Sequence, residues 1–440
     1  MFRFLVLIFS LYSLLFALVF QDGYFYEIES LNQRSYIQKM DLNKTIWQKE
    51  IDSPFVRDMK YYKNYLYIVY DFEDDFVLEK IDIKNGESVF KKRFGSLGID
   101  FAFSLAVDKD GIFIAGGSNG DFGKNMGESD IFLLRVSFNG DIIWKRSFGS
   151  EFDEWGKKIV LNKEYLFLIC ENGKESDPRD VFVIKLDKEA NEISSSTIKT
   201  KKEDIVKDAF IDKELYILGE SWGSFEDYKN SGFSDIYLAR LSLENEVKKI
   251  YEFGGSGAEE AFFLKGDRNY LYFSIKSFSI LGYSFSESGF FVARSDKNLS
   301  KIVFLPVNGK DIAISKDTLY IAGKKIKEYN LKDFYKLSAI FRFYTQFFKR
   351  GAKEHEVLYW FDRINKDGVK KAFFSLLNSK EFKEKNEDLP KEIFIKRLYK
   401  VFLNREPKSK ALNFWMGFSE RRVLTGVLNS KEFKSLIESF

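Results

Sequence analysis

The chain has 440 residues, which is enough for two or three domains. Apolar residues make up 45% of it and aromatic residues 18%, a composition that excludes a disordered chain and favours β structure. The net charge of +3 hides an asymmetry, because residues 331–440 carry 24 Lys and Arg against 14 Asp and Glu, which leaves the remainder acidic. The basic part predicts an anionic partner; the alternative is a solvated, Lys-rich helical surface.

The N-terminus predicts export. Residues Phe4–Phe20 form a nearly unbroken apolar run behind Arg3, as in a secretory signal. No clear pair of small residues marks a cleavage site near Ala17, and the run lies at the short edge for a membrane span. Residues 1–21 are therefore predicted to be a signal peptide or an N-terminal membrane anchor. The protein would be secreted, periplasmic or on the cell surface, and would meet a membrane only through that anchor.

From residue 22 to about residue 325 the chain repeats with a period of about 50 residues. Each unit offers four short apolar runs, separated by Asp-Gly, Asn-Gly or Lys-Asn pairs that suit tight hairpin turns. The units begin near Val56, Phe101, Trp155, Ile205, Glu259 and Asp311. Repeated four-stranded antiparallel units predict a β-propeller, over residues 22–328. The single cysteine, Cys170, lies in one of the apolar runs and excludes a disulfide within the chain.

The number of blades is predicted to be six, with seven as the alternative. The N-terminal segment adds three strands, and the end of the repeats adds two: Tyr24–Ser30, Ser35–Asp41, Thr45–Ile51, Ile312–Ser315 and Leu319–Gly323. A six-bladed ring could close by building one blade from both ends of the chain, which would remove exposed sheet edges. A seventh blade around the surplus strand is the other solution.

Residues 329–440 are predicted to form a helical domain, because the apolar period there changes to 3.6. The domain contains two copies, at about 334–385 and 389–440, and the heptapeptide of residues 377–383 recurs identically at 428–434. Asn378 with Glu381, and Asn429 with Glu432, are predicted to form capping boxes. The two copies are predicted to share an aromatic core made of Tyr344, Trp360, Phe382, Tyr399, Trp415 and Phe433.

No catalytic signature is present in the sequence. The only histidine, His355, lies in a charged segment, and there is no phosphate-binding, dinucleotide-binding or EF-hand pattern. The sequence therefore predicts no catalytic residue, no metal, no cofactor and no nucleic-acid partner. The question of enzymatic activity stays open, with a non-enzymatic protein favoured.

Ligand contacts are predicted on one face of the propeller, where acids follow the Phe-Gly turns and two tryptophans could stack on sugar rings. These candidates are Asp100, Asp153, Glu154, Trp155, Trp222, Glu259 and Glu260. Long loops on the same face add Asp121, Glu128, Glu171, Asp177, Glu226 and Asp227. The alternative is that these acids serve the turns themselves. Attachment to the envelope is predicted for the outward cations Lys396, Arg397, Lys400, Arg405, Arg421 and Arg422.

Two resemblances support this organisation. Residues Asp130–Leu161 resemble a β-propeller repeat of bacterial extracellular proteins, which implies the fold and little about function. Residues Leu398–Pro407, Phe414–Trp415 and Asn429–Phe433 resemble a bacterial helical family of unknown function, numbered 4214, that often ends secreted and surface proteins. This chain departs from that family's pattern, with Asn404 and Ala411 in place of Gly and Lys408 in place of Asp.

The sequence thus favours a non-enzymatic, exported or cell-surface protein. Its propeller loops would bind an envelope glycan or a surface protein, and its basic helical domain would mediate attachment to the envelope. The alternative function is a propeller-type polysaccharide hydrolase or lyase that uses the acidic loop residues.

Overall fold

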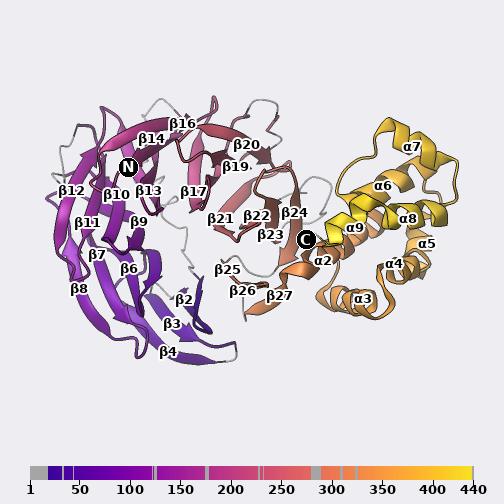
Figure 1. Ribbon diagram of the computed structural model, residues 1–440, viewed down its shortest axis with the longest axis horizontal. Helices are drawn as coiled ribbons and strands as arrows, with labels where there is room; N and C mark the ends of the chain where they lie inside the picture. The colour runs from indigo at the N-terminus through magenta and orange to yellow at the C-terminus, as the bar shows by residue number, and fades with distance from the viewer. Residues whose placement is uncertain are drawn as a thin grey trace.

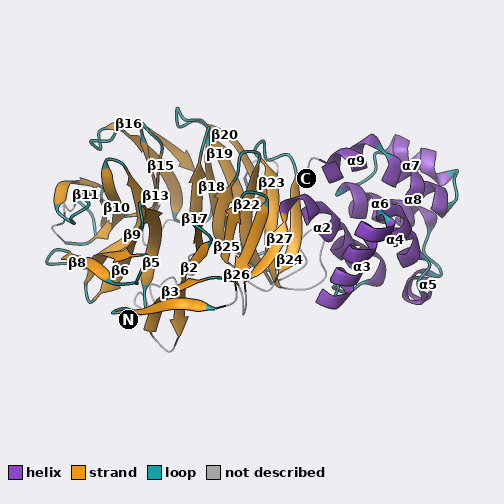
Figure 2. Cartoon of the chain, turned by 60° about the horizontal axis from the view of Figure 1, so that its bottom comes forward, coloured by secondary structure: helices purple, strands orange, loops and turns teal. Residues whose placement is uncertain are grey.

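The structure is a computed structural model, and it describes residues 18–31, 34–42, 44–120, 122, 126–173, 178–225, 228–230, 232–278, 289–307, 311–322 and 326–438. A ring of β-sheets forms the larger part of the molecule, and helices form a separate layer against one side of the ring (Figures 1 and 2). Within these residues, no helix has the length and apolar character needed to cross a membrane.

Seven antiparallel sheets form the blades of a propeller, and within each blade the strands pair in sequence order. Blades 1 and 2 contain β1 (Leu18–Gln21), β2 (Tyr24–Leu31), β3 (Arg34–Met40), β4 (Thr45–Ile51), β5 (Val56–Tyr62), β6 (Tyr65–Phe72), β7 (Asp75–Asp82) and β8 (Ser88–Phe94). Blades 3 and 4 contain β9 (Asp100–Asp108), β10 (Gly111–Ser118), β11 (Asp130–Val136), β12 (Ile142–Phe148), β13 (Asp153–Leu161), β14 (Leu166–Gly173), β15 (Asp180–Leu186) and β16 (Glu192–Ile198).

Blades 5 and 6 continue the same plan with four strands each, and blade 7 has three. Blades 5 and 6 contain β17 (Asp204–Ile211), β18 (Leu215–Ser221), β19 (Asp235–Leu241), β20 (Val247–Phe253), β21 (Glu259–Gly266), β22 (Tyr270–Ser277), β23 (Gly289–Asp296) and β24 (Ile302–Val307). Blade 7 contains β25 (Asp311–Ser315), β26 (Thr318–Ala322) and β27 (Lys327–Asn330).

Burial follows the position of a strand within its blade. The second strand of blade 3, β10, is buried along its whole length because neighbouring blades cover both of its faces. The fourth strand β8 instead alternates between exposed and half-buried residues. Its exposed positions include Lys91 and Arg93, and charged side chains on an edge strand discourage pairing with another chain.

The propeller has seven blades, so the predicted six are wrong and the alternative is confirmed. The sequence missed two strands at the ends of the ring. Leu18–Gln21 had been assigned to the leader, but it pairs with β2 as the first strand of blade 1. Lys327–Asn330 spans the predicted boundary at residue 328, and it pairs with β26. Because each end of the repeat finds its own partners, no blade is built from both ends of the chain.

The ring closes where blade 7 meets blade 1, without a shared strand. Phe20 and Phe25 of blade 1 pack on the ring of Tyr320 from blade 7, with ring centroids 4.8 and 4.9 Å apart. This joint has a smaller buried core than the joint between blades 2 and 3. Closure of the ring therefore rests on fewer buried apolar side chains than the joint between blades 2 and 3.

The helical domain has two copies of the same four-part layout. The first contains α2 (Phe334–Phe343) with the π-helical turn η2 (Tyr344–Phe348), then α3 (Glu354–Asp367), α4 (Val369–Leu377) and α5 (Lys380–Asn386). The second contains α6 (Lys391–Leu403), α7 (Ser409–Met416), α8 (Glu420–Asn429) and α9 (Lys431–Glu438). A short 3-10 turn, η1 (Leu331–Asp333), joins β27 to α2.

The two copies share one core, as the sequence predicted. Four members of the predicted aromatic set are buried in it, and Trp360 and Trp415 pack against it half-buried. The same cluster includes Ile312 and Leu319 of blade 7, so the helical domain and the propeller are joined by a continuous apolar core.

Buried polar contacts fix the helical domain to blade 6. Ser338 of α2 donates to the Phe304 carbonyl of β24 at 2.5 Å. The fully buried Arg294 of β23 donates to the Leu331 carbonyl at 2.9 Å. From the second copy, Asn404 donates to the Ile302 carbonyl at 2.7 Å. Contacts from both copies to the propeller make a rigid mounting rather than a flexible tether.

The predicted capping boxes are wrong by one residue. Ser379, not Asn378, is the N-cap of α5, and its hydroxyl accepts the Phe382 N–H at 3.2 Å. Glu381 does not reach back to the cap, because Arg350 binds its carboxylate at 2.8 and 2.9 Å. The second copy repeats both contacts: Ser430 with Phe433 N–H at 3.1 Å, and Arg405 with Glu432 at 2.7 and 2.6 Å.

Candidate ligand-binding site at the channel mouth

The acids that follow the Phe-Gly turns serve the turns. The Ser150 N–H donates to the Glu154 carboxylate at 3.2 Å, and the Ser150 hydroxyl donates to its other oxygen. The same contact from the fourth residue upstream recurs at three further turns: Ser96 to Asp100 at 2.6 Å, Thr200 to Asp204 at 2.5 Å and Gly255 to Glu259 at 3.0 Å. Asp100, Glu154 and Glu259 are all buried. These three acids therefore stabilise the turns, which is the alternative that the sequence left open for them.

A second repeated acid explains the glycine of the Phe-Gly pair. Asp130 begins β11, and a Cβ atom on Gly149 would lie 2.2 Å from its Oδ1 atom. Gly254 meets Asp235 in the same way, with a distance of 2.0 Å. The Asp side chain therefore leaves no room for a side chain at the Gly position, which is why the two residues recur together along the chain.

The other predicted contacts stay closer to solvent. Asp153, Trp155, Trp222 and Glu260 are all half-buried. The Trp155 ring lies against blade 3, where a Cβ on Gly117 would lie 2.6 Å from its Cδ1 atom. Of the long-loop set, Glu171 is buried and Glu128 is exposed. The remaining four fall outside the described residues: Asp121, Asp177, Glu226 and Asp227.

β-bulges place a set of residues that the sequence did not single out. The inner strands of blades 2 to 5 each carry one residue that lacks a counterpart on the neighbouring strand. These residues, here called the bulge ring, are Arg57, Phe103, Lys157 and Lys207. The signal in the sequence was the extra residue between otherwise alternating positions, which is weak without knowledge of the partner strand.

Three members of the bulge ring lie close together on the adjacent inner strands β5, β9 and β13. The Arg57 guanidinium carbon lies 5.8 Å from the centre of the Phe103 ring, and the Lys157 Nζ atom lies 4.1 Å from the same centre. Arg57 belongs to blade 2 and Lys157 to blade 4, which are not neighbours. Two cations from separate blades therefore approach one aromatic side chain inside the channel.

The cations of the bulge ring differ in their partners. Arg57 donates two hydrogen bonds from Nε to the Asp71 carboxylate, at 3.0 and 2.9 Å. Lys207 lies 3.3 Å from a Glu220 carboxylate oxygen. For Lys157, the described residues provide no hydrogen bond and no ion pair. Burial lowers the pKa of Lys157; Arg57 and Lys207 add to that effect, and Glu171 opposes it.

Below the bulge ring, polar side chains join neighbouring blades. Asp58 accepts the Leu105 N–H of the next blade at 3.0 Å, and Asp208 accepts the Leu264 N–H at 2.8 Å. Lys158 lies 3.1 Å from Asp208. Burial raises the pKa of Asp58, but nearby lysines, Lys158 among them, outweigh it and hold the pKa at about 2. The charged side chains of this layer have hydrogen-bond or ion-pair partners, whereas Lys157 has none among the described residues.

The loops at the same end of the blades expose large apolar side chains. Leu97 is 99% exposed and Phe233 is 74% exposed. Leu97 lies in the loop between β8 and β9, and Phe233 lies in the loop between β18 and β19. They stand singly in different blades and do not by themselves form an apolar patch.

The cations predicted to attach to the envelope mostly have partners. Four of the six make polar contacts within the domain: Lys396 to Glu392 at 2.5 Å, Arg397 to Asn386 at 3.0 Å, Lys400 to Glu406 at 2.8 Å and Arg405 to Glu432 at 2.6 Å. Arg421 and Arg422 of α8 are exposed and lie over aromatic rings, 5.4 Å from Phe374 and 4.3 Å from Phe418. Within the described part of the chain, these two make neither a hydrogen bond nor an ion pair through their side chains, whereas Arg397 has an amide partner and the other three have acidic partners.

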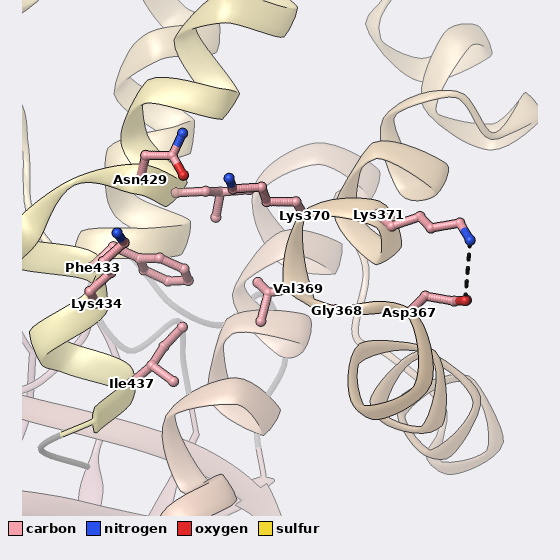
Figure 3. A pocket seen from close by; sticks show the side chains of 10 residues that line it. Asp367, Gly368, Val369, Lys370, Lys371, Asn429, Phe433, Lys434 and Ile437 are labelled. Carbon is pink, nitrogen blue, oxygen red and sulfur yellow. Dashed lines mark hydrogen bonds and ion pairs between the residues drawn. The ribbon is translucent and has the colours of Figure 1, made fainter.

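A cleft of about 460 Å³ lies between the two helical copies (Figure 3). Its floor is apolar and lysines stand around it, with Lys371 held 3.3 Å from Asp367. The lining residues are Asp367, Gly368, Val369, Lys370, Lys371, Leu428, Asn429, Phe433, Lys434 and Ile437. Across the residues described, no group of three His, Cys, Asp or Glu side chains could hold a metal ion.

Comparison with known proteins gives separate matches for the two parts of the molecule. Residues 373–437 match the family model described as a domain of unknown function, DUF4214. No curated protein sequence matches the chain. Solved propellers resemble it in fold: the Pan2 WD40 domain of Neurospora crassa has 11% identity and a TM-score of 0.46, over 71% of this chain and 87% of that one. The Cps50 (Swd1) propeller of Myceliophteria thermophila has 10% identity and a TM-score of 0.47, over 71% and 96%.

Proposed function

We propose that the protein is a non-enzymatic binding protein of the cell exterior, whose propeller captures a glycan or a surface protein at the channel mouth. One observation carries this proposal, namely the division between two sets of residues at the same end of the blades. The buried acids Asp100, Glu154 and Glu259 are bound to turn N–H groups. Aromatic and cationic side chains such as Trp155 and Lys157 lie near that end of the inner strand β13 and keep part of their surface accessible. That arrangement suits binding more than acid–base chemistry.

A polysaccharide hydrolase or lyase would use two carboxyl groups aimed at the ligand. The acids that the repeat supplies at this end of the blades accept hydrogen bonds from their own turns and, for Glu259, also from Ser277 of the neighbouring strand, so their geometry gives this alternative no support. We therefore take binding as the function.

The apolar run of residues 4–20 is the basis for proposing export. The first blade restricts where a leader could be cleaved. Leu18 is 3% exposed and pairs with Glu27 of β2, so removal of Leu18–Gln21 would unpair the inner edge of blade 1. We expect any cleavage to fall before Leu18. N-terminal sequencing of the exported protein tests this, and a mature chain that begins at Asp22 would contradict it.

Attachment to the envelope is assigned to Arg421 and Arg422, the two exposed cations of the predicted set whose side chains make no hydrogen bond or ion pair in the described structure. Because the helical domain is fixed to blade 6, a surface that holds α8 would also set the direction of the channel. Replacing both with Gln should weaken salt-sensitive binding of the full chain to isolated envelopes. The pair Lys396 and Lys400, replaced in the same way, is the matched control.

Ligand capture is tested with the full chain on a glycan array and in pull-downs from envelope extract. Trp155→Ala removes a half-buried indole at the mouth and should weaken capture at least tenfold. Trp47→Ala removes a half-buried indole on the outer strand β4, where its Nε1 atom donates to the Ile83 carbonyl at 3.0 Å, and should leave capture unchanged. Equal capture by wild type and Trp155→Ala would refute the mouth as the binding site.

A further inference from the structure

Lys157 is the one member of the bulge ring whose charge is not matched locally. Its neighbours Arg57 and Lys207 have carboxylates at 2.9 and 3.3 Å, whereas no hydrogen-bond acceptor reaches its ammonium group from the residues described. The nearby acid Glu171 is already engaged, since one of its oxygens accepts the Val206 N–H at 2.8 Å and the other lies 3.5 Å from Arg179. The Lys157 side chain is half-buried, so its ammonium is partly removed from water but can still be reached by a ligand. An anion at this point would supply the acceptor that the described residues do not.

We propose that the bulge ring binds the anionic group of an acidic polysaccharide, with Lys157 as its direct partner. This inference rests on the proposed binding function and names the class of ligand. A carboxylate, sulfate ester or phosphate ester would accept hydrogen bonds from Lys157, and the charges of Arg57 and Lys207 would lie around it.

The aromatic side chains beside Lys157 favour a sugar as the carrier of that anion. Phe101 and Phe103 are half-buried and lie 6.3 Å apart between ring centres. Trp155 stands two residues before Lys157 on β13 and is also half-buried. Flat aromatic faces pack against the apolar face of a sugar ring, and an acidic sugar presents such a face together with a negative charge. An acidic peptide would use the lysine but would leave these rings without a matching surface.

The site around Lys157 differs from the equivalent positions of the other blades in one residue of the repeat. Blade 3 carries Gly117 where blades 2, 4 and 5 carry Asp71, Glu171 and Glu220, and the Trp155 ring occupies the space that a side chain there would need. The absence of an acid at this position is what leaves aromatic surface, instead of a competing carboxylate, beside Lys157.

The test measures binding of the full-length protein to four polyanions by titration calorimetry: polygalacturonate, dextran sulfate, dextran phosphate and polyglutamate. Methyl-esterified galacturonan and dextran are the neutral counterparts. At least one of the anionic polymers other than polyglutamate should bind at least tenfold more tightly than its neutral counterpart. Which of the three binds identifies the carboxylate, sulfate or phosphate as the source of the charge.

Lys157→Gln should reduce that affinity to the level of the neutral polymer without changing the melting temperature. The matched control is Lys145→Gln, since Lys145 also lies over an aromatic ring, 5.0 Å from Phe122, but on the outer strand β12. Unchanged affinity in Lys157→Gln would overturn the inference, and so would equal binding of polyglutamate. Capture of neutral glycans that depends on Trp155 and not on Lys157 would overturn only the anionic class, and the proposed function would stand.

Discussion

The propeller and the helical domain are both built by repetition, but they repeat different kinds of residue. In the helical domain the repeated residues form the core and its polar bridges: Trp360 donates to the Tyr344 hydroxyl at 3.0 Å, and Trp415 donates to Tyr399 at 2.9 Å. In the propeller the repeated residues form turns, whereas the bulge ring changes from Arg to Phe to Lys between blades. The repeated residues therefore stabilise the fold in both regions. In the propeller, the positions that vary from blade to blade form the surface that a ligand could contact.

The largest effect is expected where the helical copies repeat most closely. Trp415→Ala removes an indole that packs against the shared core and lies against Gly426, whose Cβ would meet its Cη2 atom at 2.2 Å. The loss should lower the free energy of unfolding by about 3 kcal/mol. Trp360→Ala should have a similar cost because its contacts are equivalent. Chemical denaturation of the full chain, followed by circular dichroism at helical wavelengths, measures both.

A double variant sharpens this prediction. If the copies share one core, Trp360→Ala and Trp415→Ala together should cost a different amount from the sum of the single variants. Strict additivity, with two separate helical transitions, would show that the copies fold independently.

Glu27 breaks the propeller repeat at the joint between blades 7 and 1. The equivalent residues on the second strands of the other blades are apolar and buried: Ile68, Ile114, Leu168, Ile217, Phe273 and Ile321. Glu27 lies on the same face of β2 as Phe25, which packs on Tyr320 of blade 7. Burial, with a further contribution from Glu29, raises the pKa of Glu27 to about 7.

The pH dependence of this joint follows from that pKa. The folded state holds the Glu27 proton more tightly than the unfolded state, so stability is greatest below the ordinary pKa of 4.5 and falls as the pH rises through 7. Glu27→Gln removes the ionisation and should raise the free energy of unfolding by about 2–3 kcal/mol at pH 8. At pH 4.5 it should change little. Denaturation at the two pH values decides this, and an equal effect at both would assign the gain to packing.

The turn acids should matter for stability and not for ligand capture. Glu154→Ala leaves the Ser150 N–H and hydroxyl without their acceptor, which should cost about 1–3 kcal/mol. Glu164→Ala, at an exposed turn between β13 and β14, should change stability by less than about 0.5 kcal/mol. Loss of ligand capture in folded Glu154→Ala protein would instead give this acid a direct role.

The limits of the sequence are clear from particular residues. The starts of the repeats at Val56, Phe101 and Trp155 were found to within two residues, because period-two patterns and tight turns are local signals. β1 was missed because an apolar run describes a leader and a buried strand equally well. Ser379 was missed as a cap because Asn378 is an equally good capping residue. The bulge ring depends on register with a partner strand, and the Arg350 bridge to Glu381 spans 31 positions, so neither had a local signature.

The smallest predicted effect concerns a position where this chain differs from its family. Lys408 is the N-cap of α7, with an extended backbone and no side-chain cap, and its counterpart Lys353 caps α3 in the first copy. Asp is expected at this position from the family pattern, and its carboxylate would accept a free N–H of the first turn. Lys408→Asp should therefore stabilise the domain by about 1 kcal/mol.

Lys410→Asp separates capping from charge, because it makes the same charge change inside the first turn of α7. It can gain only from the helix dipole, about 0.3–0.5 kcal/mol. An equal gain in both variants would mean that charge alone acts and that Lys408 is not a missing cap. A gain confined to Lys408→Asp would show that the acidic residue typical of the family has a structural role in α7. Lys353, at the equivalent position of the first copy, would then be a second site where substitution by Asp should stabilise the domain. Positions that correspond in the two copies would then contribute to stability in the same way.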